Sequence, residues 1–122
     1  MSEPSVGGGD VAIWLDGKEI ILKPTLDACI KISKMGGAGG TNAVAQRLAN
    51  LDFEMFCEVI GAALGVNPVQ AKAIPKAVFE AGMVHLAGPL LTYIRVINNG
   101  GTLPDEEEGE AGEEAETPLA SE

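Results

Sequence analysis

Two short apolar runs, 11–15 and 18–22, are separated by the dipeptide Asp16-Gly17. Asp-Gly readily adopts the positive φ angles of a type I′ turn, so this stretch predicts a β-hairpin with a two-residue loop. Alternation along the two strands gathers the following apolar side chains on one face: Val11, Ile13, Leu15, Ile20 and Leu22. A lone hairpin of this length is only marginally stable in water. We therefore expect this face to pack on a layer of helices.

The opposite face of the hairpin is partly apolar as well, because it carries Trp14 and Ile21. One interpretation is that a helix or the N-terminal segment covers these side chains. The other is a docking patch, since tryptophan is enriched where one protein fills a pocket of another, or a partner paired with a free strand edge. Met83 raises the same choice between a core position and an adaptable contact surface. We take Trp14, Ile21 and Met83 as candidate partner-binding residues.

Capping and helix-breaking residues divide the rest of the body into helices. Thr25 caps the first helix, and the glycine-rich stretch 36–40 ends it after Met35. The later helices are expected from a cap at Thr41 or Asn42 to about Asn50, from a cap at Asp52 to Gly65, from Pro68 to about Ala73, from Pro75 to Ala81, and from about Met83 to Asn98. Asn67 caps the helix that begins at Pro68, and Gln70 reaches back to it. Pro89 either kinks the last helix or marks its true first turn.

Helical spacing assigns an inward apolar stripe to each longer helix. The stripes are Leu26, Cys29, Ile30 and either Ile32 or Ser33 in the first helix, Val44, Leu48 and Leu51 in the second, Phe53, Phe56, Ile60 and Leu64 in the third, and Leu86, Leu90, Ile94 and Ile97 in the last. Aromatic residues make up only 4% of the chain, so the core is mainly aliphatic and favours packed helices. The predicted fold class is α+β, mainly α, with an N-terminal β-hairpin packed on a small bundle of about five helices.

Charge divides the chain into two parts. From Pro104 onward there are nine acidic residues and no Lys or Arg, which accounts for nearly all of the net charge of −10. Low hydrophobicity combined with a single sign of charge is typical of disorder. We therefore expect a flexible N-terminus at 1–9, a hairpin plus helical domain at 10–99, and a disordered acidic tail at 100–122.

The near-neutral body and the acidic tail disfavour direct nucleic-acid binding, which needs clustered Lys and Arg. No apolar stretch reaches the length of about 18 residues that a membrane span requires, and the N-terminus lacks the pattern of a secretory signal. We therefore expect a cytoplasmic protein that binds neither nucleic acid nor membrane. In that compartment Cys29 and Cys57 are better explained as two buried thiols than as a disulfide.

Residues suited to catalysis are scarce. His85 is the only histidine, so any Cys-His or Ser-His arrangement would have to use it as the base. The glycine-rich stretch 36–40 is not followed by the lysine of a phosphate-binding loop. No group of carboxylates has the spacing of a metal site. We therefore expect no enzymatic activity, no cofactor and no bound metal.

Four short motifs follow the hairpin in order: Leu22-Lys23-Pro24-Thr25-Leu26, the glycine-rich break at 36–40, Ile60-Gly61-Ala62-Ala63-Leu64, and the ending Glu80-Ala81-Gly82-Met83 with Ala87-Gly88-Pro89. Over about residues 11–98, this series resembles the small tail assembly chaperones of long-tailed phages and gene transfer agents. Two features depart from that family. Pro75 interrupts a region that the family usually keeps as one helix, and the tail is unusually acidic.

The resemblance implies a non-catalytic assembly factor that binds the long, hydrophobic, helical tape measure protein and helps to recruit major tail tube subunits. It further implies a protein of the producing cell's cytoplasm that is absent from the finished particle, and it leaves self-association open.

The tail, which includes Asp105, Glu106, Glu107 and Glu108, either attracts or masks a basic partner or simply keeps the protein dispersed. The alternative function is a small acidic regulator or inhibitor, whose tail mimics DNA and binds a basic partner.

Overall fold

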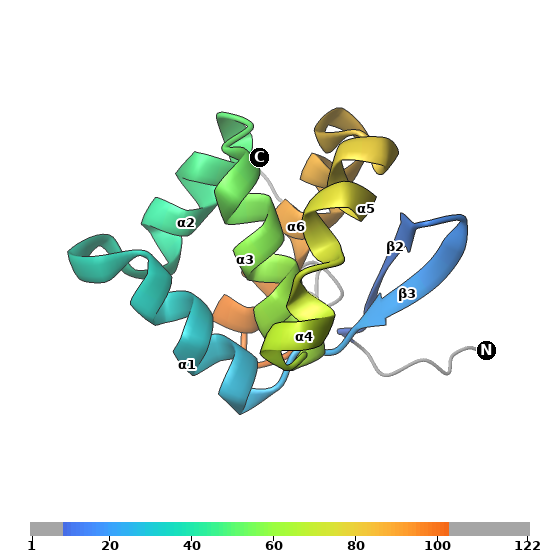
Figure 1. Ribbon diagram of the computed structural model, residues 1–122. Coiled ribbons are helices and arrows are strands. Elements are labelled where there is room, and N and C mark those ends of the chain that lie inside the picture. The colour runs from blue at the N-terminus through green and yellow to red at the C-terminus, as the bar shows by residue number, and fades with distance from the viewer. Residues whose placement is uncertain (1–8, 103–122) are drawn as a thin grey trace, which may run out of the picture.

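The structure, a computed structural model, describes residues 9–102. A two-stranded antiparallel sheet packs against one side of a group of helices (Figure 1). In chain order the elements are β2 (Val11–Leu15), β3 (Lys18–Leu22), α1 (Leu26–Met35), the 3-10 helix η1 (Gly37–Gly39), α2 (Gly40–Ala49), α3 (Phe53–Leu64), α4 (Pro68–Ala71), α5 (Ile74–Ala81) and α6 (Met83–Asn98). The predicted fold class, a mainly helical protein with an N-terminal hairpin, is confirmed. Residues 1–8 of the expected flexible N-terminus and 103–122 of the expected acidic tail lie outside the described residues.

The hairpin has the predicted register, in which Leu15 pairs with Lys18 across the turn. Asp16 and Gly17 have φ angles of 57° and 73°, as a type I′ turn requires. The predicted inner face is the one that packs on the helices, with Ile20 half-buried. Its other members are buried: Val11, Ile13, Leu15 and Leu22.

Three helix starts have the predicted caps. Thr25 Oγ1 accepts a hydrogen bond of 3.1 Å from the backbone N–H three residues later, and Asp52 Oδ1 accepts one of 3.3 Å in the same way. At the start of α4, the side chains of Asn67 and Gln70 each accept from the other's backbone N–H. Gly65 closes α3 in the left-handed conformation, with φ 66°. Because each cap satisfies donors or acceptors that a helix end leaves unpaired, local sequence sets these boundaries.

The predicted cap of the second helix, at Thr41 or the residue after it, is wrong. α2 begins at Gly40, and its N-cap residue, Gly39, has no side chain to accept a hydrogen bond. The physical reason is the preceding turn, because η1 carries the chain directly into α2 without an extended capping residue. The hydroxyl of Thr41 instead donates to Oδ1 of Asn98, the last residue of α6, at 2.8 Å.

Two predicted boundaries, the end of α4 and the start of α5, are shifted, whereas α6 continues through its internal proline. α4 ends two residues before its predicted end, at Ala71, and α5 begins at Ile74 because Pro75 fits the first turn, where its missing N–H is not needed. Pro89 lies inside α6 and does not mark its first turn. The preceding residue, Gly88, lacks the Cβ that would clash with the proline ring. This small residue lets the helix continue.

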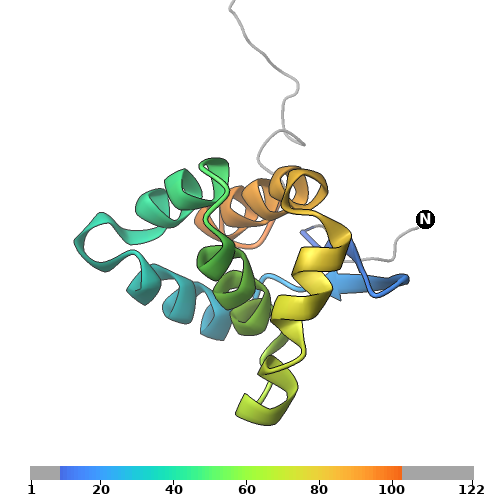
Figure 2. The ribbon, with the colours of Figure 1, turned by 45° about the horizontal axis from the view of Figure 1, so that its top comes forward.

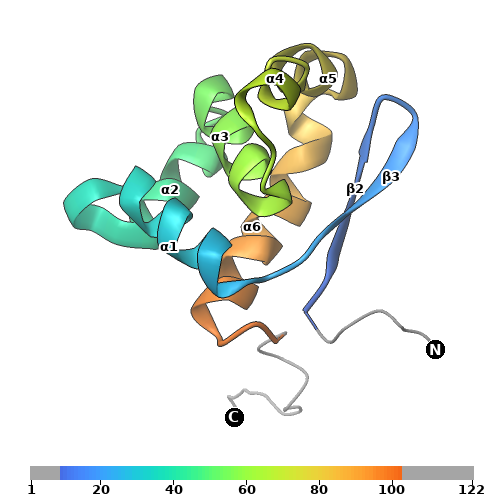
Figure 3. The same ribbon diagram turned by 60° about the horizontal axis from the view of Figure 1, so that its bottom comes forward.

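The core is built around α6, which contacts β2, α2, α3 and α5. Figure 3 shows α6 running between the hairpin and the α1–α2 pair. Tyr93, which the sequence did not single out, is fully buried and donates its hydroxyl hydrogen to the carbonyl oxygen of Lys23 at 2.7 Å. The predicted stripe of the last helix is confirmed, since all its members are buried: Leu86, Leu90, Ile94 and Ile97.

The predicted stripe of α1 is right only in part, since Ile32 is buried and Cys29 is half-buried. Its buried residues are Ala28 and Ile32, whereas Leu26 is 76% exposed and Ile30 45% exposed. A helix of this length has two parallel i, i+4 rows of apolar side chains, and the row that contains Ala28 faces the neighbouring helices. Leu51 also lies outside the core, because it follows α2 in the left-handed conformation (φ 60°) and is exposed.

The helices form an open arrangement rather than a parallel bundle. α1 and α2 lie side by side and are joined at their ends by η1, while the short α4 projects from the other helices (Figure 2). Within residues 9–102, no single helix is long and apolar enough to cross a membrane; only Pro68–Ala81 and Met83–Asn98 taken together pass that test, and they are bent by 117°.

Candidate functional site

The outer face of the hairpin places two of the candidate residues in solvent. Trp14 is 62% exposed and Ile21 is 37% exposed, so no helix covers them within the part of the chain that the structure describes. Met83 lies elsewhere, at the start of α6, where it is half-buried and packs against the core. The next residue, Val84, is 74% exposed. The structure therefore places Trp14 and Ile21 together on one face but gives Met83 a largely structural position.

The remaining candidates belong to the acidic tail. Asp105, Glu106, Glu107 and Glu108 lie outside the described residues, and their expected role as an electrostatic arm stays a prediction.

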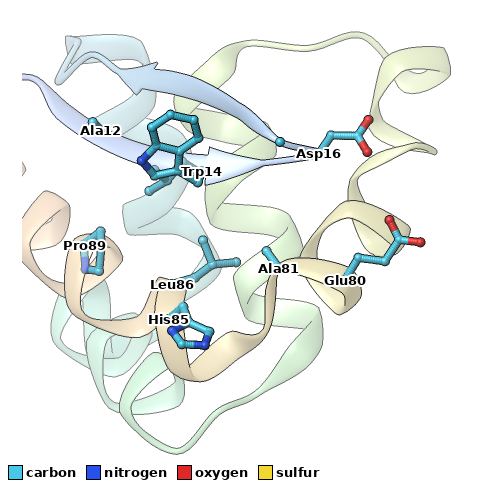
Figure 4. A pocket seen from close by; sticks show the side chains of 10 residues that line it. Ala12, Trp14, Asp16, Glu80, Ala81, His85, Leu86 and Pro89 are labelled. Atoms are coloured by element: carbon cyan, nitrogen blue, oxygen red, sulfur yellow. The ribbon is translucent and has the colours of Figure 1, made fainter.

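A groove runs between β2 and the helices α5 and α6, and it encloses about 520 Å³. We call it the hairpin groove. Figure 4 shows Asp16 and Glu80 at one end of the groove, beside the hairpin turn, and Ala12 and Pro89 at the other end. Between these ends, Trp14 lies on the strand side and His85 and Leu86 on the helix side. The groove thus brings Trp14 together with two carboxylates and a histidine that the sequence did not associate with it.

The charge of the hairpin groove is acidic at one end. Asp16 belongs to the hairpin turn and Glu80 to the exposed side of α5. The sequence placed Asp16 in the hairpin turn and gave no reason to associate it with Glu80. The fold brings them to one rim because the inner face of β2 packs on α5 and α6. The described residues that line the groove include no Lys or Arg.

A second groove lies between α1, α3 and the segment that carries α4 and α5, and it encloses about 420 Å³. We call it the helix groove. Its lining is mainly apolar, with Lys31 and Glu58 as its only charged side chains. The other lining residues are Met35, Cys57, Gly61, Ala62, Val66, Ala71 and Ile74. Sequence reasoning missed this groove, because its members were assigned to five different helices or connections.

Burial favours the protonated forms of the Cys57 thiol and the Tyr93 phenol. Burial, together with the nearby carboxylates of Glu58 and Glu54, raises the pKa of the Cys57 thiol, so the reactive thiolate is disfavoured. Burial likewise raises the pKa of Tyr93 to about 12. Cys29 and Cys57 are both free thiols, as expected, although both are half-buried rather than fully buried.

One exposed ion pair stabilises the start of α3. Arg47 Nε lies 2.7 Å from Asp52 Oδ2. The hydrogen bond from Arg47 lowers the pKa of the Asp52 carboxyl, with help from the backbone N–H that Asp52 caps. This shift belongs to a helix cap and not to a reactive centre, since structural ion pairs also perturb pKa values.

Between residues 9 and 102, no group of three or more His, Cys, Asp or Glu side chains is placed to hold a metal ion. The described lining of the hairpin groove carries the two carboxylates of Asp16 and Glu80, and that of the helix groove carries Lys31 and Glu58. Comparison with protein-family models, curated proteins and solved structures found no match to this chain.

Proposed function

We propose that this protein is a non-catalytic tail assembly chaperone of a long-tailed phage or gene transfer agent. In this role it binds the hydrophobic, helical tape measure protein and helps to recruit major tail tube subunits around it. It acts in the cytoplasm of the producing cell and leaves before the particle is complete.

The amount of apolar surface that the body leaves exposed is the observation that carries the proposal. Outside the core, the exposed large hydrophobic side chains are Trp14, Ile21, Leu26, Ile30, Leu51, Leu64, Val69, Phe79 and Val84. Single exposed apolar residues are ordinary on a protein surface. Here two exposed side chains, Leu64 and Val69, lie in the segments that also form the helix groove. Exposed apolar side chains on the helices that form an apolar groove are typical of a surface for protein contact.

The helix groove has the shape and chemistry to hold one face of an amphipathic helix. Helix-in-groove recognition places apolar side chains at i, i+3, i+4 and i+7 into a hydrophobic trough. Met35 of α1, Ala62 of α3 and Ile74 of α5 contribute apolar side chains to the lining of the groove. Small residues at Gly61 and Ala71 leave room for incoming side chains. The family resemblance supplies a partner with this chemistry, namely a helical segment of the tape measure protein.

The motifs behind the resemblance also lie at structurally meaningful positions. The Leu22–Leu26 step contains the end of β3 and the Thr25 cap of α1. The glycine-rich break forms η1, and Ile60–Leu64 forms the last turn of α3 beside the helix groove. In this proposal, the motifs that carry the resemblance coincide with ends and turns of the elements of the body.

Co-expression tests the proposal. The full chain is produced together with an apolar helical fragment of the tape measure protein encoded beside it, and the soluble fraction of the fragment is measured. We expect the chaperone to raise that fraction. Ala71→Arg, which places a long cation over the helix groove, should remove most of the effect. Ala49→Arg, at an exposed position outside the groove, should not.

Two outcomes would contradict the proposal. The fragment remains insoluble whether or not a folded chain is present, or all binding resides in residues 104–122 and disappears at high salt. The second result would favour the acidic regulator or inhibitor instead, since exposed charges are screened by salt.

A further inference from the structure

The edge of β2 presents backbone groups that no other strand uses. In an antiparallel hairpin with a two-residue loop, the residues that flank the loop bond to each other, and every second pair does not. Leu15 and Lys18 flank this loop. Trp14 and Ala12 therefore direct their N–H and C=O groups away from β3. Among residues 9–102, neither backbone makes a hydrogen bond outside the hairpin.

This unpaired edge faces a preformed groove. Ala12 and Trp14 line the hairpin groove, and Leu86 and Pro89 of α6 form the opposite side (Figure 4). Ile13 also lines it. An extended segment next to β2 would thus meet backbone donors and acceptors on one side and apolar side chains on the other. The volume of about 520 Å³ is within the range of about 300–1,000 Å³ that binding clefts show.

The two carboxylates at the turn end of the groove specify the charge of the occupant. Asp16 and Glu80 are exposed, and the described residues that line the groove provide no cation to neutralise them. A Lys or Arg side chain placed there would gain attraction to both carboxylates at once. An acidic segment would be repelled.

We propose that the hairpin groove binds an extended segment of a partner protein, which adds to the edge of β2 as a third strand. Every second side chain of the segment is apolar and faces Leu86 and Pro89, and a Lys or Arg lies beside Asp16 and Glu80. This is recognition by strand addition, in which backbone hydrogen bonds give affinity and side-chain pockets give specificity. The site is separate from the helix groove, so it does not depend on the proposed tape measure interaction.

The charges of this chain argue against an occupant from the chain itself. The nine acids that follow Pro104 come without a Lys or Arg, so this segment has the same sign as Asp16 and Glu80. The β2 strand of a second copy has the sequence VAIWL and offers no cation either. A basic partner segment can form hydrogen bonds with the backbone edge of β2 and can also neutralise the two carboxylates.

Peptide titration of the full chain tests the proposal, with Trp14 as the reporter because it is the only tryptophan. The probe is an eight-residue peptide in which valine alternates with threonine or lysine. We expect a saturable shift in Trp14 emission. The same peptide with glutamate in place of lysine should bind at least tenfold more weakly. Added salt should reduce this difference in affinity between the two peptides.

Backbone methylation distinguishes strand addition from simple hydrophobic contact. Two further peptides carry N-methyl groups on alternate amides. In one peptide the methylated amides lie on one edge of the strand, and in the other they lie on the opposite edge. We expect one set to abolish binding and the other to leave it nearly unchanged, because only one edge pairs with β2. Equal binding by both methylated peptides would overturn the proposal.

Variants of the protein provide matched controls. Ala12→Pro removes an edge N–H that the hairpin does not use and should abolish binding, whereas Glu19→Pro makes the same kind of change on the other edge, at the residue paired with Trp14, and should not. Glu80→Gln should weaken binding about two- to fivefold, as expected for one exposed ion pair. Glu54→Gln, an equally exposed glutamate on α3, should have no effect. Circular dichroism checks that each variant is folded.

Three results would overturn the proposal. One is the absence of any peptide-dependent change at Trp14 while the protein is folded. Another is unaltered binding by folded Ala12→Pro. The third is self-association in sedimentation velocity that Ala12→Pro abolishes and the peptide cannot displace, which would show a second copy of this chain in the groove.

Discussion

Tyr93 joins the last helix to the end of the hairpin by a single hydrogen bond. Its side chain is fully buried, and its hydroxyl donates to the carbonyl oxygen of Lys23 at 2.7 Å. We expect Tyr93→Phe to lower the free energy of unfolding by about 1–2 kcal/mol, because the carbonyl loses its partner while the ring still fills the core. Urea denaturation followed by circular dichroism measures the loss. An unchanged denaturation midpoint would show that the carbonyl finds water instead.

The same residue predicts how stability depends on alkaline pH. The pKa of Tyr93 is raised to about 12 in the folded protein, whereas an unfolded tyrosine titrates near about 10. A raised folded pKa means that the protonated form is favoured in the fold. Its contribution is therefore complete below pH 10 and is lost as the pH rises toward 12. We expect wild type to lose stability over this range and Tyr93→Phe, which cannot ionise, to lose less.

Residue-level patterns predicted turns and helix caps better than they predicted which face of a helix is buried. Asp16, Thr25 and Asp52 act through hydrogen bonds or φ angles within a few residues, so their roles can be read locally. Leu26 and Ile30 follow helical spacing as well as Ala28 and Ile32 do, yet they are exposed. The choice between the two rows depends on where α2 and α3 pack, which no local pattern contains.

At the scale of elements, the turn between α1 and α2 depends on one close approach. A Cβ atom at Gly36 would lie 1.8 Å from the carbonyl oxygen of Gly40, and both atoms belong to backbone that cannot easily move. We expect Gly36→Ala to lower the free energy of unfolding by about 1–3 kcal/mol, in the range of other steric insertions. Thermal or urea denaturation measures the change.

Gly61 provides the matched comparison for the turn. It lies inside α3, and an added Cβ would meet Ile74 at 3.6 Å and Val66 at 3.7 Å, which are ordinary contacts. Gly61→Ala should therefore raise the free energy of unfolding by about 0.5–1 kcal/mol, because glycine is a poor helix former. If Gly36→Ala raised the free energy of unfolding as Gly61→Ala does, helix propensity rather than steric contact would govern the turn.

The candidate site could be predicted from sequence only in part. The alternation of the hairpin indicates that Trp14 and Ile21 face away from the core, and they do. The hairpin groove could not be predicted from this alternation, because Asp16 and Glu80 are far apart in sequence and come together only when β2 packs on α5 and α6. The helix groove likewise combines α1, α3 and the α4–α5 segment. Sites made between elements require the tertiary packing that local patterns do not encode.

At the scale of the whole molecule, the two ends of the described body meet. Gly9 is buried, and a Cβ atom there would lie 2.0 Å from the carbonyl oxygen of Gly101 and 2.7 Å from Cγ1 of Val96. The N–H of Gly101 donates to the carbonyl oxygen of Val96 at 2.8 Å. The chain therefore enters and leaves the fold at one place, against the end of α6, and the hairpin is held there as well as through its inner face.

Gly9→Ala tests this closure. We expect it to lower the free energy of unfolding by about 1–3 kcal/mol, the usual cost of forcing extra atoms into a packed contact. Hydrogen exchange of the backbone amides should locate the effect. Pushing the 9–11 segment away from Gly101 should let the N–H of Gly101 and the start of β2 exchange faster than the middle of α6. Exchange that accelerates evenly throughout α6 would indicate global destabilisation instead. Unchanged stability would mean that the ends separate in solution and that the hairpin is held by its inner face alone.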